Sequence, residues 1–154
     1  MTARINEKRH ARPMIRACIK RFGHTRRQFL ALSTKDARAF VGFSKVSKLR
    51  KQDPRYQHAL KDCANPPLAM AELSVLCLRL AQSQIGCTSR WLASDLAEGV
   101  LLLEAAFQAA CLNVEINLYG IQDKKYARKM RAHLRKLKIE SARYKHKIMK
   151  GLGY

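Results

Sequence analysis

The chain has few residues that interrupt helices, and it lacks the patterns typical of metal or phosphate sites. Its 154 residues include only 7 Gly and 4 Pro, while Ala, Leu, Lys and Arg, which favour helices, occur throughout. The histidines form no HExxH motif and no cluster with cysteine; they are His10, His24, His58, His133 and His146. A glycine-rich phosphate loop and a nucleophile elbow are also missing. We therefore expect no metal, no cofactor and no P-loop chemistry.

Cysteine pairs and membrane-length apolar runs are also missing. The five cysteines, Cys18, Cys63, Cys77, Cys87 and Cys111, contain no CxxC pair, which predicts buried free thiols in a reducing compartment. The longest apolar stretch, "GVLLLEAAFQAACLNV", is interrupted by Glu104 and Gln108. It predicts no transmembrane segment.

Acidic residues are scarce and unevenly placed. The chain carries 31 Lys and Arg against 11 Asp and Glu, for a net charge of +20. Residues 1–52 contain fifteen Lys/Arg and two acidic residues, and residues 122–154 contain twelve Lys/Arg and two acidic residues. Residues 53–121, between them, contain four Lys/Arg and seven acidic residues. Two basic parts thus flank a nearly neutral one, and their self-repulsion favours a polyanionic partner. Nucleic acid is the commonest such partner and an anionic membrane comes second; a solvated charged surface is the alternative.

Phosphate contacts of an RNA partner are expected from both basic parts. The candidate residues are Arg9, Arg12, Arg16, Lys20, Arg21, Arg26, Arg27, Lys48, Arg50, Lys51, Lys124, Arg128, Arg131, Arg135 and Lys138. The Arg-rich, acid-poor N-terminus also resembles a mitochondrial presequence. This favours the mitochondrial matrix over the cytoplasm, and leaves open whether the N-terminal arm is cleaved.

Apolar spacing predicts an all-α protein, an antiparallel helical bundle over residues 24–154 that follows a basic N-terminal arm over residues 1–23. No segment reads as a strand. Capping residues, prolines and glycines predict the helix bounds. The expected helices cover residues 24–46, a short stretch opened by Pro54, a segment from Asn65 to Gly86, a long segment from Ser94 or Asp95 to Gly120, and residues 122–150.

Three polar residues on the long apolar segment are site candidates. A carboxylate such as Asp95 can act as a general acid or base, or it can cap the helix with Glu98 completing a capping box. Asn113 and Asn117 lie four residues apart, so their amides share one helix face and need a ligand, a neighbouring helix or a subunit contact as partner. Chemistry alone favours the structural interpretation for all three.

Three blocks carry a resemblance to a known family. They are "DARAF" at 36–40, "ALKDCANPPLAMAEL" at 59–73, and "SDLAEGVLLLEAAFQAACLNVEINLYGIQD" with "KKYA" at 94–127. In their order and spacing, residues 26–150 resemble the cyclodeaminase/methenyltetrahydrofolate cyclohydrolase family, whose all-helical fold also forms the C-terminal part of formimidoyltransferase-cyclodeaminase.

The resemblance implies a dimer that binds folate near its interface and converts methenyl- or formimino-tetrahydrofolate. The family's site positions correspond to Ser94, Asp95, Asn113 and Asn117. Family enzymes also begin with a Gly-rich "PGGGS"-type segment, whereas "MTARINEKRHARPMIRACIKRFGH" contains none, and family members are typically not basic. Only glycine allows the close backbone approach of a ligand that such a segment provides.

The sequence therefore favours a non-catalytic RNA-binding or structural subunit of a large ribonucleoprotein assembly, such as a mitochondrial ribosome, on a degenerate cyclodeaminase-like fold. Its partners are RNA and neighbouring proteins, with a homodimer or family-like helix-bundle dimer as a further expectation. The alternative is a folate-dependent one-carbon enzyme, a cyclohydrolase or cyclodeaminase with a tetrahydrofolate derivative as substrate and Asp95, Asn113 and Asn117 in its site. A second alternative is an accessory subunit of a mitochondrial membrane complex, with its basic parts on anionic lipid.

Overall fold

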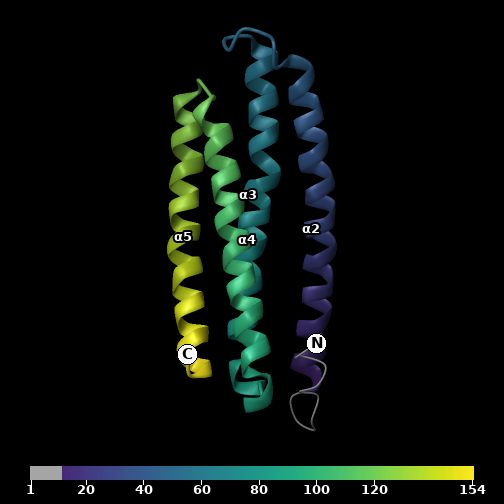
Figure 1. Ribbon diagram of the computed structural model, residues 1–154, viewed down its shortest axis with the longest axis vertical. Helices are drawn as coiled ribbons and strands as arrows, with labels where there is room; N and C mark the ends of the chain where they lie inside the picture. The colour runs from purple at the N-terminus through teal and green to yellow at the C-terminus, as the bar shows by residue number, and fades with distance from the viewer. Residues whose placement is uncertain (1–11) are drawn as a thin grey trace.

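The computed structural model describes residues 12–154, which form four long helices. They are α2 (Arg12–Val46), α3 (Pro54–Gln82), α4 (Ala93–Tyr119) and α5 (Lys124–Leu152), with the short 3-10 turns η1 (Ile85–Cys87) and η2 (Arg90–Leu92) between α3 and α4. The long helices run side by side along the longest axis (Figure 1). Helices make up 88% of the described residues, which contain no strand, and this confirms the predicted all-α bundle.

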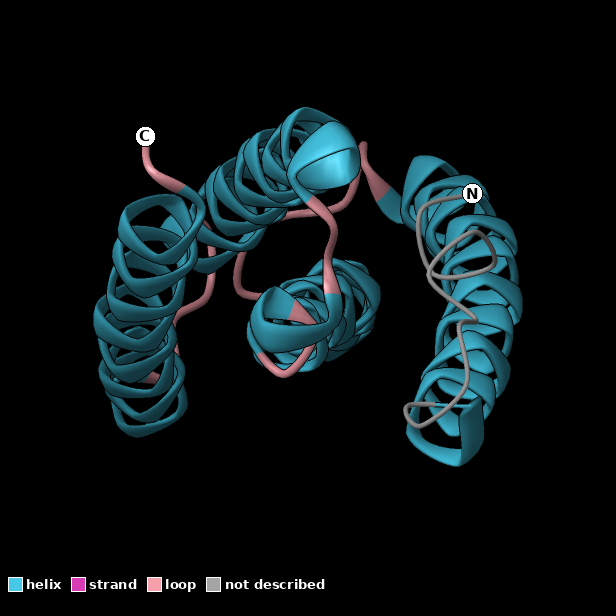
Figure 2. Ribbon diagram, turned by 90° about the horizontal axis from the view of Figure 1, so that it is seen from below, coloured by secondary structure: helices cyan, strands magenta, loops and turns pink. Residues whose placement is uncertain are grey.

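Helix α3 is the centre of the bundle. It packs against α2, α4 and α5, and α4 also packs against α5. Figures 1 and 2 show α2 and α5 at opposite edges of the molecule, with α3 and α4 between them. The core includes the fully buried side chains of Leu78, Phe107, Val114 and Leu134. Among the five cysteines, all free, only Cys87 is partly exposed.

Helix α3 is one continuous helix, although the sequence predicted two. Asp53 caps its N-terminus by accepting a hydrogen bond from the Arg55 backbone N–H, and Pro54 stands in its first turn, as expected for a residue without an N–H. Pro66 and Pro67, expected to open a second helix, lie inside α3 and are buried. Each proline removes one hydrogen bond from the helix. Packing on three sides keeps α3 helical through this pair.

Helix α2 begins earlier than expected. It starts at Arg12 and runs without a break to Val46, so the predicted helix start at residue 24 is wrong. Ile15 and Cys18 are buried against the rest of the bundle, which explains why the first turns are held. The division of the chain at residues 23 and 24 is not marked by any interruption in α2; residues 1–11 lie outside the described part.

Helix α4 is buried on one side only. Asp95 lies in its first turn, but the helix begins at Ala93 with no side-chain cap, so the predicted capping box is wrong. The opposite side exposes large apolar side chains: Leu101, Leu102, Leu112, Ile116 and Tyr119. By length and composition alone, the segment Arg90–Tyr119 could span a membrane. Its other side packs on α3 and α5, as a bundle helix does.

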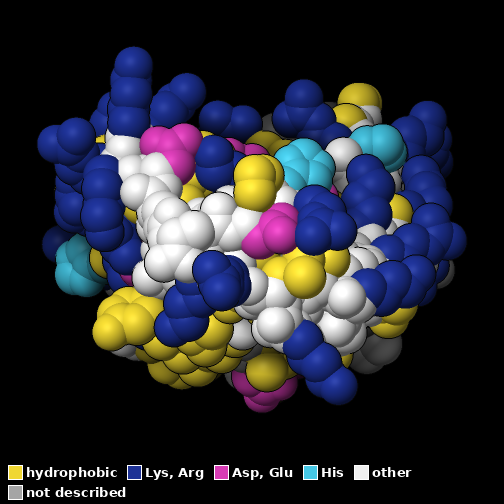
Figure 3. Space-filling model, turned by 90° about the horizontal axis from the view of Figure 1, so that it is seen from above, with side chains coloured by type: hydrophobic (Ala, Val, Ile, Leu, Met, Phe, Trp, Pro, Cys, Tyr) yellow, Lys and Arg dark blue, Asp and Glu magenta, His cyan; other side chains and the backbone are white. Residues whose placement is uncertain are grey.

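The two basic helices form the outer edges. Helix α2 carries nine Lys/Arg and one Asp, and α5 carries twelve Lys/Arg and one Glu. Viewed from above, Lys and Arg lie along the left, upper and right sides of the molecule, and hydrophobic side chains gather on its lower side (Figure 3). Most of the positive charge therefore lies on the two edge helices, and the lower side in this view carries less of it.

Candidate functional site

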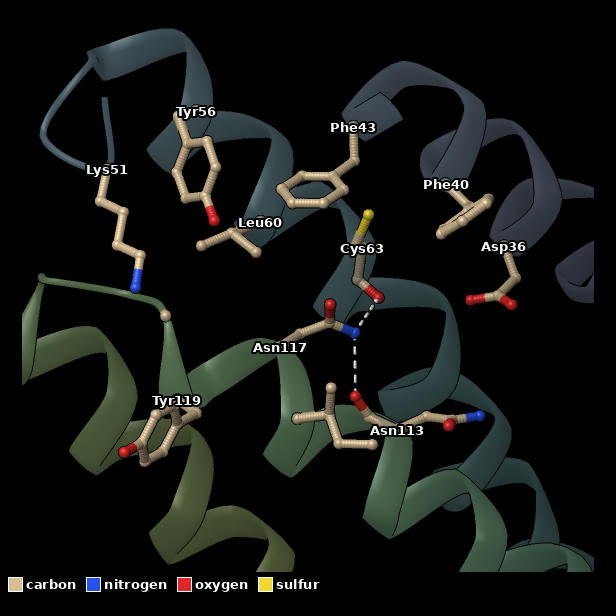
Figure 4. A pocket seen from close by; sticks show the side chains of 12 residues that line it. Asp36, Phe40, Phe43, Lys51, Tyr56, Leu60, Cys63, Asn113, Asn117 and Tyr119 are labelled. Atoms are coloured by element: carbon tan, nitrogen blue, oxygen red, sulfur yellow. Dashed lines mark hydrogen bonds between the residues drawn. The ribbon is translucent and has the colours of Figure 1, made fainter. Parts of the chain in front are cut away.

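A groove between α2, α3 and α4 brings polar and aromatic residues together. It encloses a cavity of about 540 Å³ near the upper end of the bundle, and Figure 4 shows its side chains. Its residues are Asp36, Phe40 and Phe43 of α2, Lys51 of the following loop, Tyr56, Leu60 and Cys63 of α3, Asn113, Ile116, Asn117 and Tyr119 of α4, and Gly120.

Asn117 joins α4 to α3 at the base of this groove. Its Nδ2 donates to the Cys63 carbonyl oxygen at 3.1 Å and to the Asn113 carbonyl oxygen at 2.8 Å (Figure 4). In a regular helix the Cys63 carbonyl accepts from the backbone N–H four residues later, but that residue is Pro67 and has no N–H. The amide therefore replaces the hydrogen bond that the proline removes. Because both N–H bonds of Nδ2 are used, the orientation of the amide is fixed and its Oδ1 remains an acceptor.

Asn113 and Asp95 occupy different places on α4. The side chain of Asn113 lines the groove and is exposed. Asp95 lies 18 residues earlier, roughly 27 Å along the helix at 1.5 Å per residue. Thus the structure brings Asn113 and Asn117 together but separates Asp95 from them within one chain. Ser94 is exposed beside Asp95.

Aromatic rings form the upper part of the groove. Phe43 and Tyr56 meet edge to face, with ring centroids 5.3 Å apart and planes at 63°. Phe40 is 66% exposed and Tyr119 is 91% exposed, so each offers a free ring face. Flat aromatic surfaces next to a few fixed polar groups are typical of sites for organic ring compounds.

Asp36 and Cys63 supply ionisable groups to the groove. Asp36 is half-buried and is the only acid among the 35 residues of α2. Burial raises the pKa of the Cys63 thiol, and the negative charges of Asp36 and Asp62 raise it further. The thiol is therefore protonated at neutral pH and is a poor nucleophile. Sequence reasoning quoted Asp36 in a family block but missed it as a site residue; an isolated acid in a basic helix was the available signal.

Lys51 is positioned by a network at the end of the bundle. Gln57 Nε2 donates to the carbonyl oxygens of Lys51 at 2.7 Å and Gly120 at 3.1 Å, and its Oε1 accepts from the Gln122 backbone N–H at 2.8 Å. These bonds hold the α2–α3 loop to the α4–α5 turn, so the Lys51 ammonium faces the groove (Figure 4). The sequence placed Lys51 among RNA contacts and did not indicate this position.

The residues predicted to contact RNA do not form one surface. Those of residues 12–51 belong to α2 and the loop after it, and those of residues 124–138 belong to α5, at the opposite edge (Figure 2). Arg131 is half-buried and donates to Glu115 Oε2 at 3.0 Å. Arg9 lies outside the described residues. Within residues 12–154, no group of three metal-ligating side chains is brought together.

Comparisons with known proteins agree on one family. The family model for formiminotransferase-cyclodeaminase matches residues 1–136. The crystal structure of formiminotetrahydrofolate cyclodeaminase from Thermotoga maritima superposes with a TM-score of 0.92 at 24% identity, covering 99% of this chain and 78% of that one. No curated protein matches the chain in sequence.

These findings correct the first interpretation of the sequence. The family match and the shared fold point to a folate-dependent cyclodeaminase-type domain, so the prediction of a non-catalytic RNA-binding subunit of a ribonucleoprotein is wrong. The family match also covers the N-terminal residues that were expected to fall outside the resemblance. A large positive charge was the misleading signal, because it describes the surface and carries no information about the fold.

Proposed function

Because the chain belongs to the formiminotransferase-cyclodeaminase family, we propose that its groove binds a tetrahydrofolate derivative and that the domain is a folate-dependent cyclodeaminase-type enzyme. The observation that carries this proposal is the composition of the groove. Aromatic faces, a fixed amide, a carboxylate and an ammonium group converge on one cavity of about 540 Å³.

The groove matches the chemistry of a reduced folate. Phe40 and Tyr119 offer exposed ring faces against which a flat pterin can stack. The Oδ1 of Asn117 is held as an acceptor by the two bonds of its Nδ2, and pterin rings carry N–H donors. The Lys51 ammonium suits a folate carboxylate, since charge-assisted hydrogen bonds are the stronger ones.

Asp36 is the proposed acid–base residue. A cyclodeaminase reaction on formimino-tetrahydrofolate forms a bond from a second folate nitrogen to the formimino carbon, and breaks the bond from that carbon to the departing nitrogen. When the formimino group enters protonated, its nitrogen carries two hydrogens, and it departs as ammonia after gaining the one proton that the attacking nitrogen loses. A positioned carboxyl group can carry out both transfers. Asp36 is the only carboxylate that lines the described groove.

A second copy of the chain would explain the distant Asp95. Residues 95 and 117 are equally far from Ala106, which is exposed on the open side of α4. If two α4 helices pack antiparallel about a two-fold axis near Ala106, Asp95 of one copy faces Asn117 of the other, roughly 16 Å from the axis. The exposed Leu102, Leu112 and Ile116 would then be buried in the contact.

The activity experiment compares Asp36→Asn with a matched carboxylate change. Purified protein is incubated with formimino-tetrahydrofolate and with methenyl-tetrahydrofolate, and ammonia release and absorbance are followed. We expect turnover by the wild type and a loss of about 100-fold or more in Asp36→Asn, the usual contribution of general acid–base catalysis. Asp62→Asn, at an exposed position of α3, is the control. A wild-type protein that converts neither compound contradicts the proposal.

The dimer is tested by its size and by complementation. Leu102 is 73% exposed and Ile139, on α5, is 69% exposed, so Leu102→Asp is expected to dissociate the dimer in sedimentation analysis and Ile139→Asp is not.

Mixing Asp36→Asn with Asp95→Asn subunits rebuilds one intact site in each mixed dimer. Half the dimers are mixed, so about a quarter of wild-type activity returns. No recovery in mixtures shown to exchange subunits excludes a shared site.

A further inference from the structure

A second hollow lies between α2 and α3, away from the groove. It encloses a cavity of about 390 Å³. Its residues are Lys20, Arg21, His24, Thr25 and Gln28 of α2, and Leu76, Arg79 and Leu80 of α3. Lys20, His24 and Gln28 follow one another at intervals of four, so they form a row along one side of α2, and Arg79 stands across from them on α3.

This hollow and the groove use different stretches of α2. The hollow is lined by residues between Lys20 and Gln28, whereas the groove is lined by Asp36, Phe40 and Phe43. Gln28 and Asp36 are eight residues apart, which is roughly 12 Å along the helix at 1.5 Å per residue. The hollow is therefore a separate candidate site from the groove.

The charge of the hollow is of one sign. Lys20, Arg21 and Arg79 are cationic, and the lining contains no acid. The ion pairs found among residues 12–154 involve other basic side chains: Arg55, His58, Lys61, Arg131, His133 and Lys145. Three cations held together without a carboxylate repel one another, and an anion between them relieves that repulsion.

The floor of the hollow is closed and mainly apolar. Thr25 is 4% exposed and Leu80 is 7% exposed. The Thr25 hydroxyl donates to the carbonyl oxygens of Phe22 at 3.0 Å and Arg21 at 3.2 Å, so its proton is committed within α2. The half-buried Leu76 completes an apolar wall. The hollow thus combines a cationic rim with a surface for the body of an organic molecule.

We propose that this hollow binds a small organic compound carrying two or more phosphate groups. The guanidinium groups of Arg21 and Arg79 bind phosphate oxygens in pairs, and Lys20 adds a point charge. A single carboxylate neutralises only one of these cations, whereas linked phosphates reach several. The wall of Leu76 and Leu80 receives the organic body. The limited volume, confined to two turns of α2, suits a small compound.

The binding experiment separates this hollow from general attraction to a +20 protein. Fluorescently labelled ATP is titrated at 150 mM salt into wild type, into Lys20→Gln/Arg79→Gln, and into Arg135→Gln/Lys136→Gln on α5. All four changed side chains are exposed, and both double variants lose two charges. The hollow variant is expected to bind about 100-fold more weakly, at roughly tenfold for each charged hydrogen bond, and the α5 variant within about twofold of wild type. Equal weakening in both variants, or no saturable binding to wild type, overturns the proposal.

Competitors define the ligand class. Unlabelled ATP is expected to displace the probe better than pyrophosphate, which has no organic body, and better than AMP, which has one phosphate. Leu76→Ala is expected to weaken the binding of ATP and to leave the binding of pyrophosphate unchanged. If citrate displaces the probe as well as ATP does, the hollow selects for charge alone and the phosphate assignment is wrong.

Discussion

The hydrogen bond between Asn117 and Cys63 leads to a quantitative stability prediction. Asn117→Ala removes the donor that satisfies the Cys63 carbonyl, and Pro67, four residues later, supplies no replacement. A carbonyl left without a donor in a partly buried position costs about 1–3 kcal/mol. With a urea m-value of about 2 kcal/mol/M, a loss of 2 kcal/mol lowers the unfolding midpoint by about 1 M.

A double-mutant cycle isolates the cause. In Pro67→Ala, the backbone N–H of the new residue donates to Cys63, so the side chain of Asn117 is no longer needed there. Asn117→Ala should then cost less than about 0.5 kcal/mol, giving a coupling free energy of about 1–2 kcal/mol. The loss of packing by the buried Pro67 ring affects both arms of the cycle equally and cancels.

The assay is urea unfolding followed by circular dichroism at one fixed protein concentration. Asn113→Ala is the control, since its side chain is exposed one turn earlier on the same helix; we expect a change within about 0.5 kcal/mol. If Asn117→Ala costs the same with and without Pro67, the amide does not compensate the proline and the reasoning is refuted.

Three further perturbations follow from particular contacts. Gly153 has a φ of +90°, so Gly153→Ala should lower the free energy of unfolding by about 1–2 kcal/mol. Gly99 lies within α4, where an added Cβ meets open space, so Gly99→Ala should raise the free energy of unfolding by about 0.5–1 kcal/mol. If the urea midpoints of the two variants move in the same direction, this reasoning is contradicted. Ser141 is buried, and its Oγ has no partner in the described structure, so Ser141→Ala should raise the unfolding midpoint, and a lower midpoint shows an unrecognised hydrogen bond. Lys61 and the backbone N–H of Tyr126 hold the pKa of Asp123 below its ordinary value. The charged carboxylate therefore stabilises the fold fully above the unfolded-state pKa of about 3.9, and this stabilisation is lost as the pH falls through the lower folded-state pKa. The melting temperature of Asp123→Asn should therefore lie below that of wild type at pH 7 and approach it near pH 3; a constant difference contradicts the assignment.

Much of the fold could be predicted from the spacing of apolar residues and from helix-capping residues. Apolar spacing predicted a helix over residues 122–150, and its side chains Met130, Leu134, Leu137 and Ile148 are buried. Between Leu137 and Ile148 the polar Ser141 is buried as well, because neighbouring helices close over it. The proline pair was misread since local rules treat proline as a helix start, whereas tertiary packing and the Asn117 amide supply what the prolines remove.

Only part of the candidate site could be predicted from the sequence. The four-residue spacing of Asn113 and Asn117 placed both amides on one face, and the structure brings them to one groove. Asp36, Tyr56 and Lys51 come from a helix, another helix and a loop, and their meeting depends on how α2 and the loop pack against α3. Such long-range contacts have no periodic signature in the chain. The equal spacing of Asp95 and Asn117 from Ala106 acquires meaning only once the open face of α4 is known.

The division of charge between α2 and α5 also limits how copies of the protein stack. An exposed apolar face can promote open-ended filaments when it meets a different surface of the next molecule. Here the two flanks carry the same sign, and at 0.15 M salt their repulsion acts over about 8 Å. Sideways growth is opposed, while contact between two α4 faces is allowed. The positive flanks thus act as a barrier to polymerisation, and added salt, by weakening that barrier, should make the protein less soluble.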